Sequence, residues 1–185
     1  MKKLLSGLLV LLLIGGCSRI HTVDYPQPEG KRADMTAYGL FSEHFHEFSY
    51  LQAVELLERM GTYIVYIGYP DCNFCKALVP FIDKICEEKK MDIYYINAYP
   101  EEGEIDTENR DKLVEYLKGI NSPDPDGNPT LWAPSIIYVQ LGQVIGVHEG
   151  TVNTHDANER AMTEKEQARL EYMLAKQFDA MLERK

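Results

Sequence analysis

The sequence predicts an α/β domain, a three-layer α/β/α sandwich around a central mixed β-sheet. Two runs, 62–67 and 91–98, are rich in β-branched and aromatic residues and nearly free of charge, as is typical of buried strands. Segments with helical periodicity separate these runs, which indicates parallel strands joined by crossovers. Near the C-terminal end, the runs 135–139 and 143–148 flank Leu141-Gly142 and predict an antiparallel hairpin at the sheet edge.

Four helices are expected between and after these strands. Ser49 and Gln52 form a capping box that opens a helix over 50–60. The next runs from the cysteines to about residue 89, and a third covers 107–119. A second capping box, Thr163 with Glu166, opens the C-terminal helix. The apolar stripe of the second helix is predicted from helical spacing to comprise Phe74, Leu78, Phe81 and Ile85, widened by Ala77 and Ile82.

The first 40 residues are expected to lie outside the fold. Two lysines and an apolar run make 1–16 an export signal, because the run is too short to span a bilayer. The segment ending at Cys17 resembles the lipobox of bacterial lipoproteins, which implies cleavage before Cys17, a lipid on its sulfur and an extracytoplasmic, membrane-anchored protein. An ordinary secretory signal is the alternative. Residues 17–40, polar with prolines and Gly30, read as a flexible tether, and 41–185 as the folded domain.

Composition limits the partners. The 185 residues are 45% hydrophobic and 26% charged, as in a soluble globular domain, with a formal net charge of −10. This charge argues against binding to nucleic acid, or to an anionic membrane surface through basic patches. With Cys17 lipidated, three of the four cysteines remain. Since three cannot make a purely structural disulfide framework, a working pair and a buried single cysteine are expected.

The pair is Cys72 and Cys75, and its placement carries more information than its spacing. A C-x-x-C motif alone serves zinc, iron–sulfur and redox sites. Here it stands where a buried strand enters a helix, so Cys72 is expected at the exposed first position of that helix. Unpaired N–H groups and the helix dipole favour a thiolate there, and Lys76 adds positive charge. Cys75 lies close enough to attack a mixed disulfide formed at Cys72.

Four features from the cysteines onward resemble the thioredoxins. They are the active-site sequence with Pro80 inside its helix, a later Ala133-Pro134, and the glycines at 142 and 150. The resemblance covers about 51–185. It implies a thioredoxin-like fold and thiol–disulfide oxidoreductase activity on protein or peptide substrates, with an unidentified redox partner and no bound cofactor beyond the Cys72–Cys75 disulfide. Residues 66–72 are, in addition, similar to the bacteriocin transport accessory proteins of Gram-positive bacteria.

The same resemblance implies that Pro134 follows a cis peptide bond and faces the cysteines, so that the backbone of Ala133 can pair with an extended substrate. A trans Pro134 that only begins a strand is the alternative. Two departures from the thioredoxin pattern bear on the chemistry of the pair. Asn73 and Phe74 separate the cysteines, and Tyr66 replaces the buried acid that manages the proton of the second cysteine. A buried tyrosine is a poor base at neutral pH, so a long-lived mixed disulfide is expected. The direction of electron flow stays open.

Other residues have both a functional and a structural interpretation. Cys86 is expected to fill the core rather than act in redox chemistry. Trp132 either walls the substrate groove or is a core or rim aromatic. His44 and His46 could share a face and bind a metal, but surface histidines are favoured, and His148 and His155 are expected to be solvated. The segment 124–128 is expected to be a turn-rich loop near the active site rather than a calcium loop.

Two rival functions remain at this point. The cysteine pair could ligate a soft metal ion with a histidine completing the site. Alternatively, the protein could be a non-catalytic accessory that binds a peptide or an export machine through the groove beside Pro134.

Overall fold

The computed structural model describes residues 25–100 and 103–183. Five strands form a single sheet in the order β1-β3-β2-β4-β5. Strands β1, β2 and β3 run parallel, and β4 and β5 are antiparallel to their neighbours. In chain order the elements are η1 (Thr36–Tyr38), β1 (Phe45–Glu47), α1 (Tyr50–Glu58), β2 (Tyr63–Gly68), α2 (Asn73–Lys89), β3 (Ile93–Asn97), α3 (Thr107–Leu117), β4 (Ser135–Gln140), β5 (Gln143–Glu149) and α4 (Glu164–Leu182).

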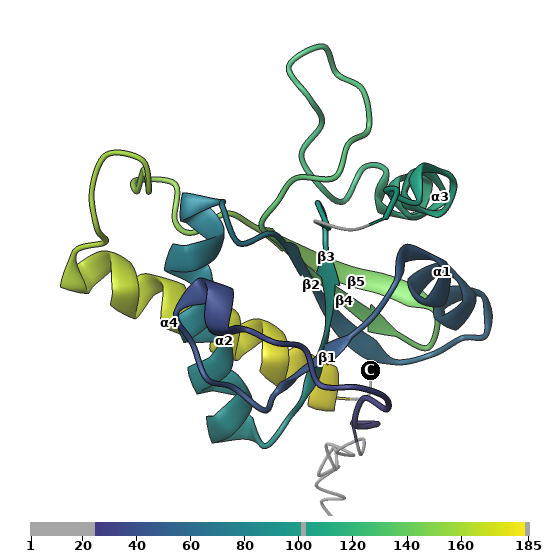
Figure 1. Ribbon diagram of the computed structural model, residues 1–185, viewed down its shortest axis with the longest axis horizontal. Coiled ribbons are helices and arrows are strands. Elements are labelled where there is room, and N and C mark those ends of the chain that lie inside the picture. The colour runs from purple at the N-terminus through teal and green to yellow at the C-terminus, as the bar shows by residue number, and fades with distance from the viewer. Residues whose placement is uncertain (1–24, 101–102, 184–185) are drawn as a thin grey trace, which may run out of the picture.

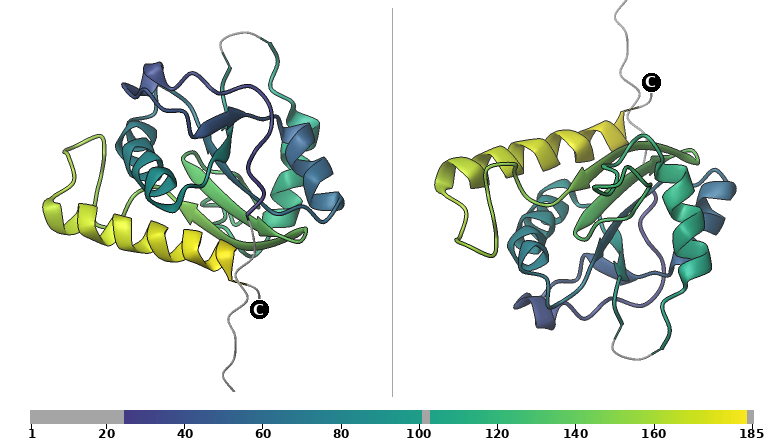
Figure 2. Two further views of the ribbon diagram at one scale, coloured as in Figure 1. Left: turned by 90° about the horizontal axis from the view of Figure 1, so that it is seen from below. Right: turned by 90° about the horizontal axis from the view of Figure 1, so that it is seen from above.

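The helices cover both faces of the sheet (Figures 1 and 2). α2 and α4 lie on one face, and α1 and α3 on the other. The strand order, the strand directions and this layering confirm the predicted α/β, thioredoxin-like sandwich with a mixed sheet. The expected helices and the hairpin are present, with both capping boxes formed.

Strand β2 is the centre of the molecule, since all six of its residues are buried. Because side chains alternate along a strand, Ile64 and Tyr66 pack into the core beneath α2 and α4, whereas Val65 and Ile67 pack into the core beneath α1 and α3. β3 and β4 flank β2 on either side. Because β2 is buried at every position, the residues that follow it, up to the start of α2, are held in a fixed place.

The flexible tether predicted for 17–40 is wrong for residues 25–40. Tyr25, Met35 and Tyr38 are buried, and the Tyr25 hydroxyl accepts a hydrogen bond of 3.0 Å from the Ile64 N–H. Arg32 forms an isolated bridge with His46 in the edge strand β1. The domain therefore begins before residue 41. The predicted signal at 1–16 and the lipidated Cys17 lie outside the described residues.

The buried face of α2 is also rotated from the predicted stripe. Phe74 and Phe81 are only partly buried, although both pack against the core. The fully covered positions are Cys75, Leu78, Val79, Ile82, Ile85 and Cys86. The stripe was predicted from the largest apolar side chains, but Cys75 and Cys86 lie on the face of α2 that packs against the core. Within the described ranges, none of the helices combines the length and the apolar character needed to span a bilayer.

Candidate active site

Cys72 occupies the N-cap position of α2, one residue before the helix begins. The prediction of an exposed first helical residue is wrong, because Cys72 is only 7% exposed. Its backbone is extended, and its Sγ accepts a hydrogen bond of 3.0 Å from the backbone N–H of Cys75. The first N–H groups of a helix have no partner within the helix, so this sulfur takes the place of a capping oxygen. A thiolate at this position is stabilised by both the hydrogen bond and the helix dipole.

Ala133 and Pro134 lie beside the sulfur, just before β4. The peptide bond between them is cis, and the Ala133 carbonyl oxygen is 3.9 Å from Cys72 Sγ. β4 is hydrogen-bonded to β2, the strand that leads to the cysteines, so two segments 61 residues apart meet at one end of the sheet. Of the two interpretations of Pro134, the structure has the cis form that faces the cysteines.

The two thiols have opposite acidities. The pKa of Cys72 is lowered to about 7, chiefly because the Cys75 thiol donates a hydrogen bond to it. Burial opposes this shift, and backbone N–H groups and the charge of Lys76 add to it. Its hydrogen bond to Cys72, together with burial, raises the pKa of Cys75 far above its usual range. At pH 7 about half of the Cys72 side chains are therefore thiolates, whereas Cys75 remains a thiol.

Asn73 and Phe74, the two residues between the cysteines, contact the loop that joins β5 to α4. The Asn73 side-chain amide donates a hydrogen bond of 3.0 Å to Asn158, and the ring of Phe74 lies edge-on to His155 with centroids 6.2 Å apart. Sequence reasoning missed this loop as part of the site. The contact joins residues 85 positions apart, and no local pattern marks it.

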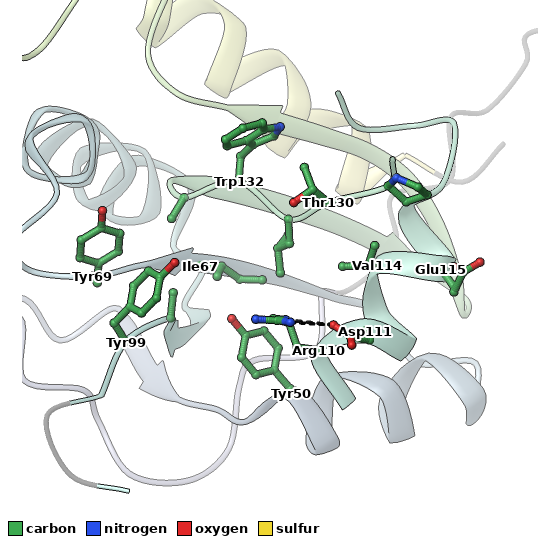
Figure 3. A pocket seen from close by; sticks show the side chains of 14 residues that line it. Tyr50, Ile67, Tyr69, Tyr99, Arg110, Asp111, Val114, Glu115, Thr130 and Trp132 are labelled. Atoms are coloured by element: carbon green, nitrogen blue, oxygen red, sulfur yellow. Dashed lines mark hydrogen bonds and ion pairs between the residues drawn. The ribbon is translucent and has the colours of Figure 1, made fainter. Parts of the chain in front are cut away.

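A cavity of about 750 Å³ opens next to Ala133 (Figure 3). Tyr69, Tyr99 and Trp132 line this cavity, and so does Arg110 from α3, which is paired with Asp111. Trp132 is 42% exposed, and its indole N–H donates to the Ser122 carbonyl at 3.1 Å. Trp132 is therefore not a core residue but a partly exposed aromatic that lines this cavity. It lies in the loop 118–134.

Cys86 has no exposed surface and faces the core from α2, as predicted. Burial raises its pKa well above the usual range, which suppresses the reactive thiolate. The prediction of solvated histidines is wrong for His148 and His155, which are 4% and 7% exposed. His155 is held by Thr151 and by the Arg160 carbonyl.

His44 and His46 share a partner rather than a solvated surface. Each imidazole donates a ring N–H to the carboxylate of Asp92 at the sheet edge, His44 at 2.8 Å and His46 at 3.2 Å. Among the described residues, no group of three histidine, cysteine or acidic side chains is arranged to hold a metal ion. The loop at 124–128 is closed by Asp124, whose carboxylate accepts the backbone N–H of Asn128 at 2.7 Å.

Comparison with known proteins adds a likeness of fold. No family model matches the chain. One similar solved structure is described as "a putative oxidoreductase with a thioredoxin fold", with 16% identity, a TM-score of 0.40, and coverage of 63% of this chain and 88% of that one. Another is thioredoxin O2 from Arabidopsis thaliana in the oxidised state, with 14% identity, a TM-score of 0.42, and coverage of 72% and 93%. The thioredoxin-like fold therefore rests on the strand order and layering of this chain itself.

Proposed function

We propose that the protein is a thiol–disulfide oxidoreductase in which Cys72 is the attacking thiol and Cys75 the resolving thiol. The observation that carries the proposal is the position of Cys72 Sγ, which caps α2 at 3.0 Å from the Cys75 N–H and lies 3.9 Å from the Ala133 carbonyl. The acidic thiol of Cys72, the thiol of Cys75 with its high pKa and the backbone of Ala133 therefore lie next to one another.

The exchange proceeds in two balanced steps. The Cys72 thiolate attacks one sulfur of a substrate disulfide, and the other substrate sulfur leaves with the electron pair of the broken bond and takes up a proton. Cys75 then loses its proton and attacks Cys72 Sγ, which forms the Cys72–Cys75 disulfide and releases the second substrate thiol. The substrate gains the two electrons that the cysteine pair loses. Of the two protons that the substrate thiols take up, one balances the proton lost by Cys75 and the other comes from solvent, because Cys72 has already ionised. The reverse sequence oxidises a dithiol.

Protein or peptide thiols and disulfides are the proposed substrates. An extended segment next to Ala133 would bring its cysteine to Cys72, and the adjoining cavity of about 750 Å³ has room for neighbouring side chains. The redox equivalents are carried by the cysteine pair itself, so no bound cofactor is required. A separate redox partner returns the Cys72–Cys75 pair to its starting oxidation state between turnovers.

The proposal includes the anchor. A lipid on Cys17 would hold the domain at the outer face of a membrane, where substrate disulfides form and persist. The similarity of residues 66–72 to bacteriocin transport accessory proteins makes exported peptides a substrate class to test first.

Trapping in cells is the direct test. A Cys75→Ser variant keeps the attacking thiol and should accumulate mixed disulfides with its natural partners, whereas a matched Cys72→Ser variant should not. Purified wild-type protein should reduce or oxidise model protein disulfides. If Cys75→Ser captures nothing and the wild type does neither reaction, the oxidoreductase is ruled out. Stoichiometric metal on the reduced protein would then indicate the metal-binding alternative, and its absence the peptide-binding accessory.

A further inference from the structure

The side chain of Tyr66 carries a buried hydroxyl group that the fold does not use. Tyr66 lies in the middle of β2 with no exposed surface, and its side chain points to the α2 side of the sheet. Its hydroxyl makes no hydrogen bond of ordinary geometry. Because a buried polar group without a partner lowers stability, such a group calls for a functional explanation.

The hydroxyl points toward the resolving thiol. A methyl group built on Gly68 would lie 2.2 Å from the Tyr66 hydroxyl oxygen and 3.2 Å from Cys75 Sγ. The oxygen and the sulfur therefore border the same small space, which exists because residue 68 has no side chain. Cys75 is itself fully buried, so bulk water does not stabilise a thiolate at this position.

Tyr38 is the other polar neighbour of the Tyr66 hydroxyl group, and it is hydrogen-bonded to Tyr95. The hydroxyl groups of Tyr38 and Tyr95 lie 2.9 Å apart and bond to each other. The ring of Tyr66 stacks on that of Tyr95 with centroids 5.7 Å apart. These contacts hold the ring of Tyr66 with its hydroxyl group beside Tyr38 and Cys75. A thiolate on Cys75 would be a charged acceptor, and hydrogen bonds to charged groups are the stronger ones.

We propose that Tyr66 is a catalytic residue of the resolving step, and that its hydroxyl donates a hydrogen bond to the Cys75 thiolate. The inference rests on the proposed function. While Cys72 is a free thiolate, the Cys75 thiol donates a hydrogen bond to Cys72, so Cys75 carries no charge for Tyr66 to stabilise. Once Cys72 is joined to a substrate, that charge is gone and Cys75 must ionise in a buried position. Burial raises the pKa of Tyr66, so the tyrosine keeps its proton and acts as a donor, not as a base.

The proposed step is balanced. The proton of Cys75 passes to solvent, the Cys75 thiolate attacks Cys72 Sγ, and the disulfide between Cys72 and the substrate breaks. The substrate sulfur leaves with the electron pair and takes up a proton. Tyr66 begins and ends the step protonated.

A coloured aromatic disulfide reagent separates the two steps in one experiment. Attack by Cys72 releases a first coloured thiolate, and attack by Cys75 on the resulting mixed disulfide releases a second. Tyr66→Phe should leave the first release unchanged and slow the second by about ten-fold or more, the value of one hydrogen bond to a charged group. Its pH profile for the second release should also move to higher pH, since the Cys75 thiolate has lost its donor.

Tyr138 provides a matched control. It is a buried tyrosine on β4 whose hydroxyl also lacks a partner, and its titration is influenced by Cys86 rather than by Cys75. Tyr138→Phe should change neither release. Both variants should be as stable as the wild type or more so, because each loses an unpartnered buried hydroxyl.

The outcomes separate this inference from the proposed function. An unchanged second release in Tyr66→Phe overturns the inference, as does a loss of stability or failure to fold, which would give the hydroxyl a structural role. Equal slowing by Tyr138→Phe overturns it too. If wild-type protein shows no second release beyond that of Cys75→Ser, the proposed function itself fails.

Discussion

The acidity of Cys72 depends first on the thiol of Cys75, and this dependence can be measured. The pKa of Cys72 is lowered from 9.0 to about 7, with the Cys75 side chain as the largest cause. Cys75→Ala removes that donor but keeps the backbone N–H that lies 3.0 Å from the sulfur. A hydrogen bond to a charged group is worth about 1.5–3 kcal/mol, and one pKa unit corresponds to about 1.4 kcal/mol. The pKa of Cys72 should therefore rise by about one to two units.

The size of this change decides which assay to use. At pH 7 the thiolate fraction would fall from about one half to about one tenth or less. However, a more basic thiolate is also a better nucleophile, which recovers much of the lost rate. A rate at a single pH would therefore change only a few-fold. The pKa should be read instead from thiolate absorbance or from alkylation rates over the whole range from pH 5 to pH 10.

The controls separate the contributions to this pKa. Cys75→Ser keeps a hydroxyl donor, so the pKa of Cys72 should stay closer to that of the wild type. Lys76→Met should shift it less than Cys75→Ala, because Lys76 is exposed and its charge is screened. An unchanged pKa in Cys75→Ala would refute the reasoning, and a larger effect of Lys76→Met would make surface charge the main cause.

The same shift has a consequence for stability. A thiol whose pKa is lowered by folding stabilises the folded state above its unfolded pKa, and this stabilisation is lost as the pH falls through the folded pKa. For Cys72 the window lies between about pH 9 and pH 7, and two units correspond to about 2.7 kcal/mol. Between pH 7 and pH 9, the free energy of unfolding of the reduced wild-type protein should therefore rise by up to about this amount relative to that of Cys72→Ser. Urea unfolding at each pH measures it, and a gain of the opposite sign would contradict the assignment.

Three further outcomes are expected. Alkylation of the reduced native protein at neutral pH should modify Cys72 first, as mass spectrometry of peptides would report, and early modification of the fully buried Cys86 would contradict its place in the core. Asp92→Asn should lower the free energy of unfolding by about 2 kcal/mol near pH 5–6. Burial opposes both pKa shifts of this pair, but hydrogen bonds raise the pKa of His44 and lower that of Asp92. The ion pair therefore weakens as the pH rises above 6.5 or falls below 3.8. If urea titrations show the same cost at pH 5–6, above pH 6.5 and below pH 3.8, the charges of His44 and Asp92 do not contribute to stability. Cys17→Ser should move the protein from the membrane to the soluble fraction with its thermal unfolding unchanged, and continued membrane association would contradict the lipid anchor.

Local signals account for the part of the fold that could be predicted. The apolar run that became β2 is buried at every position, and both capping boxes form between residues three apart. The cysteine motif was placed correctly at the start of a helix because a buried strand directly precedes it, but the burial of Cys72 was not foreseen. Each of these features depends on neighbours in the sequence, so the sequence alone specifies it.

The errors lie where burial depends on distant partners. Residues 25–40 carry a few apolar side chains without periodicity, yet Tyr25 and Met35 are buried because β2 and α2 offer them a surface. His148 and His155 are polar but covered. The contact of Asn73 with Asn158 joins the active site to a loop that nothing in its own sequence marks as functional.

A redox titration of the purified protein tests the central claim most directly. The protein is equilibrated with mixtures of reduced and oxidised glutathione, quenched by alkylation and analysed by mass spectrometry. We expect a single two-electron transition in which Cys72 and Cys75 become linked while Cys86 stays a thiol. If both cysteines remain thiols under oxidising conditions, or if Cys72 accumulates only as a glutathione mixed disulfide that Cys75 never resolves, the protein is not a dithiol oxidoreductase.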